Sequence, residues 1–172
     1  QTQLVFSMPT RAMIGMRSQL LSATRGEAVI DTQFDDYKPF AGPIQHRDKG
    51  SLLAFEDGVA NPNGISGAQD RGKLFISPKT DVYKDMIIGV HQRPGDLAVN
   101  VCKTKQLTNM RASGSDDNVQ VVPPLELNLD IAVEYIQADE LVEVTPTKLR
   151  MLKHPNHKKM AKANKAVAGM KK

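Results

Sequence analysis

Residues 103–115 read Lys103-Thr104-Lys105-Gln106-Leu107-Thr108-Asn109-Met110-Arg111-Ala112-Ser113-Gly114-Ser115. The segment holds three cations and no acid, because Asp96 is the last acid before it and Asp116 the first after it. Its hydroxyl and amide side chains can donate hydrogen bonds to phosphate oxygens or to the 2′-hydroxyl of RNA. Gly114 allows the backbone to approach closely. On composition alone, a solvated surface turn remains an alternative to a phosphate-binding loop.

The same segment continues on its N-terminal side through Asn100-Val101-Cys102, and six further motifs occur along the chain. They are Thr10-Arg11-Ala12-Met13-Ile14-Gly15-Met16-Arg17, Thr24-Arg25-Gly26, Phe34-Asp35-Asp36-Tyr37, Arg71-Gly72-Lys73-Leu74-Phe75-Ile76, Met86-Ile87-Ile88-Gly89 and Asp139-Glu140-Leu141-Val142-Glu143-Val144-Thr145-Pro146. In this order the motifs resemble the C-terminal region of the TypA/BipA translational GTPases, over about residues 1–150. The chain departs from the family pattern at Ala12 and Asp85, where glycine is expected, and at Val90, where glutamate is expected. Residues 61–69 also replace a helix that is usually rich in large apolar residues.

The resemblance implies an α+β fold in three parts. Residues 1–40 would form half of a ferredoxin-like α/β domain, similar to the last α/β domain of elongation factors. Residues 41–152 would form a small mixed β-barrel-like domain with one packed helix, and residues 153–172 a basic flexible tail.

The resemblance also implies a function on the ribosome. The parent protein would be a cytoplasmic GTPase that acts in translation or ribosome assembly under stress, with its GTP and Mg in a domain absent from this chain. For this chain we therefore expect no catalytic residue, cofactor or metal. The expected partners are the ribosome, rRNA and the tRNA acceptor end, and not a membrane. The expected RNA-binding residues are Lys103, Lys105, Thr108, Asn109, Arg111, Ser113, Arg11 and Arg25.

Charge is distributed unevenly along the chain. Residues 145–172 carry nine cations and no acid, whereas residues 1–144 contain 14 basic and 19 acidic residues, a charge of −5. This pattern indicates local contact with polyanions, through the tail and the loop. The alternatives are a tail that is only a solvated, disordered terminus, and a free-standing nucleic-acid-binding module driven by the lysine-rich tail.

Three other features of the sequence limit the class of protein to which the chain can belong. The longest apolar run, residues 86–90, is far shorter than the ~20 residues that cross a bilayer. The chain begins Gln1-Thr2-Gln3 without a signal peptide, which is typical of a fragment. Its single cysteine, Cys102, excludes an internal disulfide and fits a reducing compartment, and Lys103 beside it would lower the pKa of the thiol.

Hydrophobic patterning predicts strand, helix and strand at the start of the chain. Residues 3–8 alternate as a strand, Thr10 can cap a helix over residues 11–24, and residues 28–34 alternate again. In a ferredoxin-like fold these two strands are not neighbours, so both would have open edges. We therefore expect a homo-oligomer through these edges, or a rearrangement that closes the gap.

Beyond a linker at residues 39–50, short strands predict a closed or half-closed barrel. The expected strands are residues 51–55, 73–76, 86–91, 97–102, 119–122, 141–144 and 148–152. Asn128 can cap one helix over residues 129–137, whose stripe of Leu129, Ala132, Val133 and Ile136 would pack on the barrel.

An enzyme signature is nearly matched once. Residues 67–73 fit the glycines and lysine of a phosphate-binding GxxxxGK loop, but Leu74 stands where Ser or Thr must hold magnesium. The expected strand follows the motif instead of preceding it. An independent NTPase is therefore disfavoured. His154 and His157 have metal-like spacing without a carboxylate or thiol nearby, which fits a flexible basic end better than a metal site.

Overall fold

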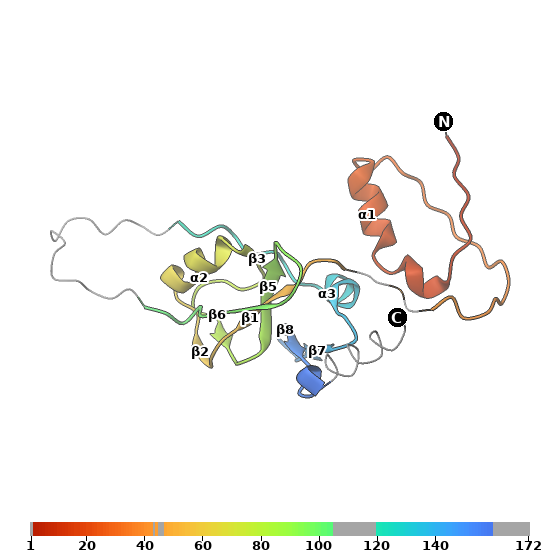
Figure 1. The fold of residues 1–172 in the computed structure, drawn as a ribbon. Helices are drawn as coiled ribbons and strands as arrows, with labels where there is room; N and C mark the ends of the chain where they lie inside the picture. The colour runs from red at the N-terminus through yellow and green to blue at the C-terminus, as the bar shows by residue number, and fades with distance from the viewer. Residues whose placement is uncertain (1, 43, 45–46, 105–119, 160–172) are drawn as a thin grey trace, which may run out of the picture. The chain divides into compact units, whose positions relative to one another are not determined.

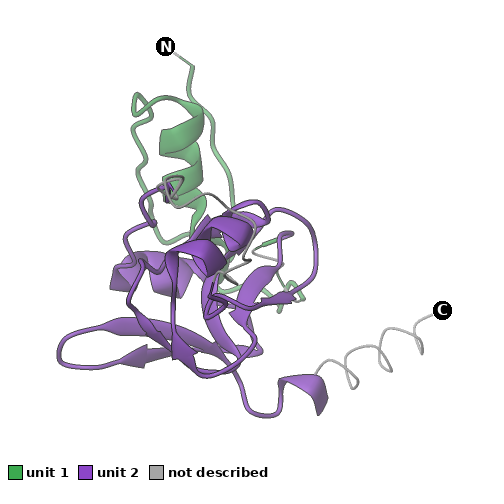
Figure 2. Cartoon of the chain, turned by 90° about the vertical axis from the view of Figure 1, so that its left-hand side faces the viewer, with its two compact units in different colours: residues 1–47 green, residues 48–172 purple. Residues whose placement is uncertain are grey.

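The computed structural model describes residues 2–42, 44, 47–104 and 120–159. The chain divides into two units, residues 1–47 and residues 48–172, each described here by itself (Figure 2). No helix in the described part of the chain is both long and apolar enough to span a bilayer.

The larger unit is built on a six-stranded sheet in which β5 is central (Figure 1). Its strands are β1 (Ser51–Ala54), β3 (Gly72–Leu74), β5 (Met86–His91), β6 (Leu97–Val99), β7 (Glu140–Val144) and β8 (Leu149–Lys153). Gly89 pairs with β1 and β3, and Ile87 pairs with β1 and β8. Because a strand has two edges, β1 occupies one edge of β5, while β3 and β8 share the other. β6 adds to β1 in parallel, and β7 adds to β8 antiparallel.

Both faces of this sheet are covered, which explains the continuous apolar run in β5. Neighbouring residues on a strand point to opposite faces. Leu52 and Ile88 therefore join one core, with α2 (Pro62–Gln69), whereas Leu53 and Ile87 join the other, with α3 (Leu129–Tyr135). A separate two-stranded sheet, β2 (Gly58–Val59) and β4 (Asp81–Val82), lies in the same unit.

The predicted α+β class is confirmed, but the barrel is not. The sheet runs in the order β6-β1-β5-β8-β7 with β3 on β5, and β6 and β7 are its two open ends in the described residues. The apolar side chains of the sheet are buried against α2 and α3, so closure into a barrel is not needed to bury them. Residues 120–122 form no strand, which makes that prediction wrong for its described part.

The predicted cap of α3 is confirmed, while its predicted stripe is only half right. Asn128 accepts a hydrogen bond from the Ile131 amide at 2.8 Å. Ala132 is fully buried, but Leu129 and Val133 are about half exposed. The helix ends at Tyr135, and this tyrosine packs on the sheet in place of the expected leucine and valine.

Lys153 lies at the centre of a buried ionic cluster. Its Nζ atom is 2.7 Å from Asp96, 2.9 Å from Glu140 and 3.1 Å from Asp139, and its side chain is only 2% exposed. Burial alone would lower the pKa of Lys153, but hydrogen bonds to Asp96 and Glu140 outweigh it and raise that pKa above its usual range. Lys153 ends β8, so its predicted place at the start of a flexible tail is wrong.

The cluster extends to the first strand and to α3. Ser51 donates from its hydroxyl to Glu140 at 2.9 Å and from its amide to Asp96 at 2.8 Å. Glu140 also accepts from the Gln137 amide at 3.0 Å, and the Ser51 hydroxyl lies 3.1 Å from that of Tyr135. Each buried carboxylate oxygen of Glu140 thus has a donor, as burial of a charge requires.

The smaller unit has local structure without a buried core. A 3-10 turn, η1 (Thr10–Met13), precedes α1 (Met16–Ala23), and Gly15 between them has a φ of 80°. This left-handed residue interrupts the single helix that was predicted over residues 11–24. None of the described residues up to Arg47 is buried, so α1 packs none of its apolar side chains in a core.

The two predicted strands of this unit are not formed. Residues 3–8 and 28–34 carry no backbone ladder, because a strand exists only when a neighbouring strand supplies its hydrogen bonds. Side chains link the first segment to residues just after the second: the Ser7 hydroxyl donates to Asp35 at 3.2 Å, and Lys38 donates to Ser7 at 2.8 Å. Hydrogen bonding to Lys38 lowers the pKa of Asp35.

Replacing the central cation should destabilise the larger unit. Lys153→Met leaves Glu140 buried without its positive partner, so the free energy of unfolding should fall by about 3 kcal/mol. Urea denaturation measures this change. Lys148→Met, at an exposed position nearby in sequence, should change stability by no more than about 0.5 kcal/mol. Equal midpoints for the two variants would contradict the assignment of Lys153 as a buried ionic anchor.

Candidate nucleic-acid interface

The cationic loop is described only at its ends. Lys103 and Thr104 lie within the described residues, and so do Arg11 and Arg25. The other predicted RNA-binding residues lie outside the described residues, and they are Lys105, Thr108, Asn109, Arg111 and Ser113. We call residues 100–104 the leading stem and residues 120–125 the trailing stem.

The leading stem is fixed to the start of α2. The Asn61 amide donates to the Val101 carbonyl at 2.9 Å, and its side-chain Nδ2 donates to the Cys102 carbonyl at 2.8 Å. Val101 is buried in the core against α2. Lys103, two residues further on, is exposed and makes no hydrogen bond or ion pair with any residue described here. Its charge is therefore available to a ligand.

The trailing stem is fixed to the end of α2. Gln69 Nε2 donates to the Val122 carbonyl at 2.7 Å, and Gln69 Oε1 accepts from the Val122 amide at 3.1 Å. The Leu125 amide then donates to the Leu74 carbonyl at 2.8 Å. Figure 1 shows both stems running beside α2.

α2 was missed by the sequence analysis, although its start carries a recognisable signal. Asn61-Pro62 places a capping residue before a proline in the first helical turn, a common start of a helix. The helix also settles the near match to a nucleotide loop. Here helix α2 comes first, and Gly72 and Lys73 lie within strand β3, which reverses the strand-then-helix order that a phosphate-binding loop requires.

Cys102 is not an activated thiol, contrary to the expectation from its neighbour Lys103. Burial raises the pKa of the Cys102 thiol, and the carboxylates of Glu56 and Asp57 raise it further. These two acids also make the base of the leading stem unfavourable for phosphate. A polyanion would therefore be held beyond Cys102, from Lys103 onward.

The two arginines of the smaller unit differ in their availability. The Arg11 guanidinium lies 4.0 Å from the centre of the Phe40 ring and donates to the Gly42 carbonyl, so it is engaged within its own unit. Arg25 is exposed, in a left-handed conformation with a φ of 55°, where α1 ends. Of the two, Arg25 presents the more accessible charge.

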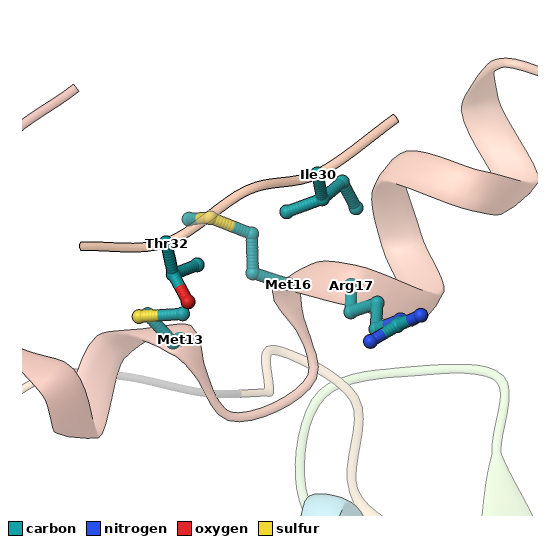
Figure 3. Close-up of a pocket in the computed structure, with 5 residues that line it drawn as sticks. All are labelled: Met13, Met16, Arg17, Ile30 and Thr32. Carbon is teal, nitrogen blue, oxygen red and sulfur yellow. The ribbon is translucent and has the colours of Figure 1, made fainter. Parts of the chain in front are cut away.

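The smaller unit contains a small, mostly apolar pocket. It is lined by Met13, Met16, Arg17, Ile30 and Thr32 (Figure 3). Arg17 makes no ion pair within the described residues, and Figure 3 shows its guanidinium directed away from the two methionines. This arrangement agrees with a side chain that extends toward solvent. No group of potential metal ligands occurs among the described residues of either unit.

Comparison with known proteins first identifies the class. Residues 1–48 match the family model described as the elongation factor G C-terminus, and residues 49–158 match that of the TypA/BipA C-terminal domain. The boundary between the two matches agrees with the boundary between the two structural units. Both models describe C-terminal regions, one of them that of an elongation factor. The chain belongs to the TypA/BipA family.

Individual relatives agree with this assignment. A putative TypA-like chloroplastic elongation factor of Arabidopsis thaliana is 50% identical over 94% of this chain and 23% of its own length. Proteins named large ribosomal subunit assembly factor BipA are 48% identical in Synechocystis, over 89% of this chain and 26% of that protein, and 39% identical in Bacillus subtilis, over 99% and 28%. The chain therefore spans about a quarter of the length of the curated relatives that it matches.

The environment of Cys102 predicts slow modification of the thiol. Because its pKa is raised, less thiolate is present at pH 8 in the folded chain than in the unfolded chain. Alkylation by iodoacetamide should therefore be several-fold slower before denaturation than after it. Cys102 is the only cysteine, so the label reports this site alone. Faster alkylation in the folded chain would show that Lys103 dominates after all.

Proposed function

We propose that this chain is the ribosome-binding C-terminal portion of a GTP-binding translation factor that acts in translation or in assembly of the large ribosomal subunit, under stress conditions. The named relatives support the ribosomal setting. GTP hydrolysis, with its Mg, would belong to other parts of a longer protein. The cytoplasm is the proposed location.

The exposed Lys103, which has no partner among the described residues and lies at the end of a fixed stem, is the observation that carries the proposal. The carboxylates of Glu56 and Asp57 act on Cys102, and Lys103 begins a segment with no acid before Asp116. We propose that Lys103, Lys105 and Arg111 contact rRNA phosphates, with Thr108, Asn109 and Ser113 donating further hydrogen bonds. The loop would approach the tRNA acceptor end. Arg25 and, to a lesser extent, Arg11 would contact rRNA or ribosomal protein.

The lysine-rich tail supports a second candidate, a free-standing nucleic-acid-binding module. The structure weakens one of its charges, since Lys153 is buried and paired with three carboxylates. A deletion that tests the tail must therefore begin after the described residues, at residue 160, so that the core stays intact.

Neutralising the loop should change the salt dependence of ribosome binding. Each phosphate contact contributes a slope of about 0.7–0.9 to log K against log[salt], so Lys103→Ala/Lys105→Ala/Arg111→Ala should lower the slope by about two to three units. Pelleting of the chain with ribosomes over a salt series measures it. A matched control is Lys49→Ala/Lys84→Ala/Arg93→Ala, which removes three exposed cations of the same unit. Equal slopes for both triple variants, or a larger loss on deletion of residues 160–172, would refute the loop as the main contact.

We also propose that the smaller unit pairs with a second copy of the chain. Many of its apolar residues are exposed, and several are aromatic: Phe6 is 71% exposed and Phe34 76%. Exposed apolar side chains on extended, unpaired segments favour association through the backbone.

Self-association should therefore be visible in the isolated chain. Sedimentation velocity should show a dimer whose fraction grows with concentration, and Phe6→Ser/Phe34→Ser should shift the equilibrium toward monomer. Val144→Ser, at an exposed apolar position of the larger unit, provides the control. A monomer at every concentration would overturn this part of the proposal.

A further inference from the structure

We infer that α2 is a strut that sets the base of the cationic loop, with Asn61 and Gln69 as positioning residues for RNA binding. The inference rests on the proposed function, because it assigns a role in the same contact. It concerns only the two stems and the helix between them, all of which lie in the described part of the chain.

The Asn61 side chain bonds to the leading stem instead of capping α2. At the position before a helix, an asparagine side chain usually accepts a hydrogen bond from the first turn. Asn61 makes no such bond, and its amide group instead donates to the Cys102 carbonyl. Its backbone amide holds Val101, so two adjacent carbonyls of the stem are bound by one residue.

Gly64 allows the leading stem to lie directly against the helix. A Cβ atom at this position would stand 2.3 Å from the Val101 carbonyl oxygen, a distance that no side chain tolerates. The close contact buries Val101 completely. The stem is therefore fixed by packing as well as by hydrogen bonds.

Gln69 makes the hydrogen bonds that hold Val122 of the trailing stem. The Val122 side chain is 66% exposed, so it gains little from apolar burial, whereas its neighbour Val121 packs against the core and the Leu125 amide bonds to Leu74. The Gln69 amide both donates to and accepts from the Val122 backbone, as a neighbouring strand would. The Gln69 side chain thus supplies the two hydrogen bonds that a neighbouring strand would have made with these residues.

The two anchors define the base of the loop. Asn61 and Gln69 lie at the two ends of an eight-residue helix, so a rise of about 1.5 Å per residue separates them by about 12 Å. Holding both ends of a long segment reduces the conformational freedom that remains to be lost on binding. The strut therefore improves affinity without touching phosphate.

This role has a distinct experimental signature. Asn61→Ser keeps a good capping residue but removes the amide donor, and Gln69→Ala keeps a strong helix former. Each variant should weaken ribosome binding by about twofold to tenfold, because one or two net hydrogen bonds are lost. The salt slope should stay unchanged, because no cation is removed. Gly67→Ala, with open space around its added methyl group, is the control within α2.

Hydrogen exchange supplies a readout on the stem itself. The Val122 amide should exchange faster in Gln69→Ala than in the unmodified chain, while the amides of β5 and the melting temperature stay unchanged. Unaltered affinity in both variants, with the loop triple variant still impaired, would overturn the strut and leave the proposed function standing. An unaltered salt slope in the loop triple variant would overturn the proposed function and the strut with it. Continued protection of Val122 in Gln69→Ala would also overturn the strut.

Discussion

The larger unit depends on one ammonium group shared by three carboxylates. Lys153 brings together residues that are far apart in sequence, since Asp96 precedes β6, Asp139 precedes β7 and Glu140 begins it. Ser51, which begins β1, joins the cluster through Asp96 and Glu140. A buried charge is tolerated only when every partner is present. The cluster therefore also fixes the register of β8, because a slip by one residue would place Leu152 or His154 among the carboxylates. The sheet that carries α2 is held in one arrangement by this requirement.

The sequence predicted elements well where the signal was local. The apolar run of β5 and the cap of α3 were both identified, because each is set by neighbouring residues. Predictions that depended on distant partners were less accurate. Residues 3–8 and 28–34 alternate like strands but have no ladder, and Lys153 resembled one more lysine of a basic tail until its three acids were located. The burial of Lys153 depends in part on Asp96, which is more than fifty positions away. The hydrophobic periodicity of the local sequence does not indicate such a distant partner.

The sequence allowed the cations of the candidate interface to be predicted, but not the residues that hold its two stems. Lys103 could be selected from an acid-free stretch, because charge is a property of the side chain itself. Asn61 and Gln69 could not, since their importance lies in carbonyl and amide groups of residues 101, 102 and 122. The raised pKa of Cys102 shows the same limit: the adjacent lysine suggested activation, but burial and the two acids across the fold decide the outcome.

In the proposed RNA contact, different residues supply the charge and the support, and this separation would allow selective binding. Phosphate contacts supply affinity over a long range but carry little information about where on the RNA they form. An otherwise acidic globule with a few mobile cations would therefore bind many sites weakly. Under the proposed strut, fixing the two ends of the cationic segment on a helix, about 12 Å apart, would restrict the phosphate arrangements that the cations can contact together. The positions set by the neutral side chains of Asn61 and Gln69 would then supply selectivity that the charges alone cannot provide.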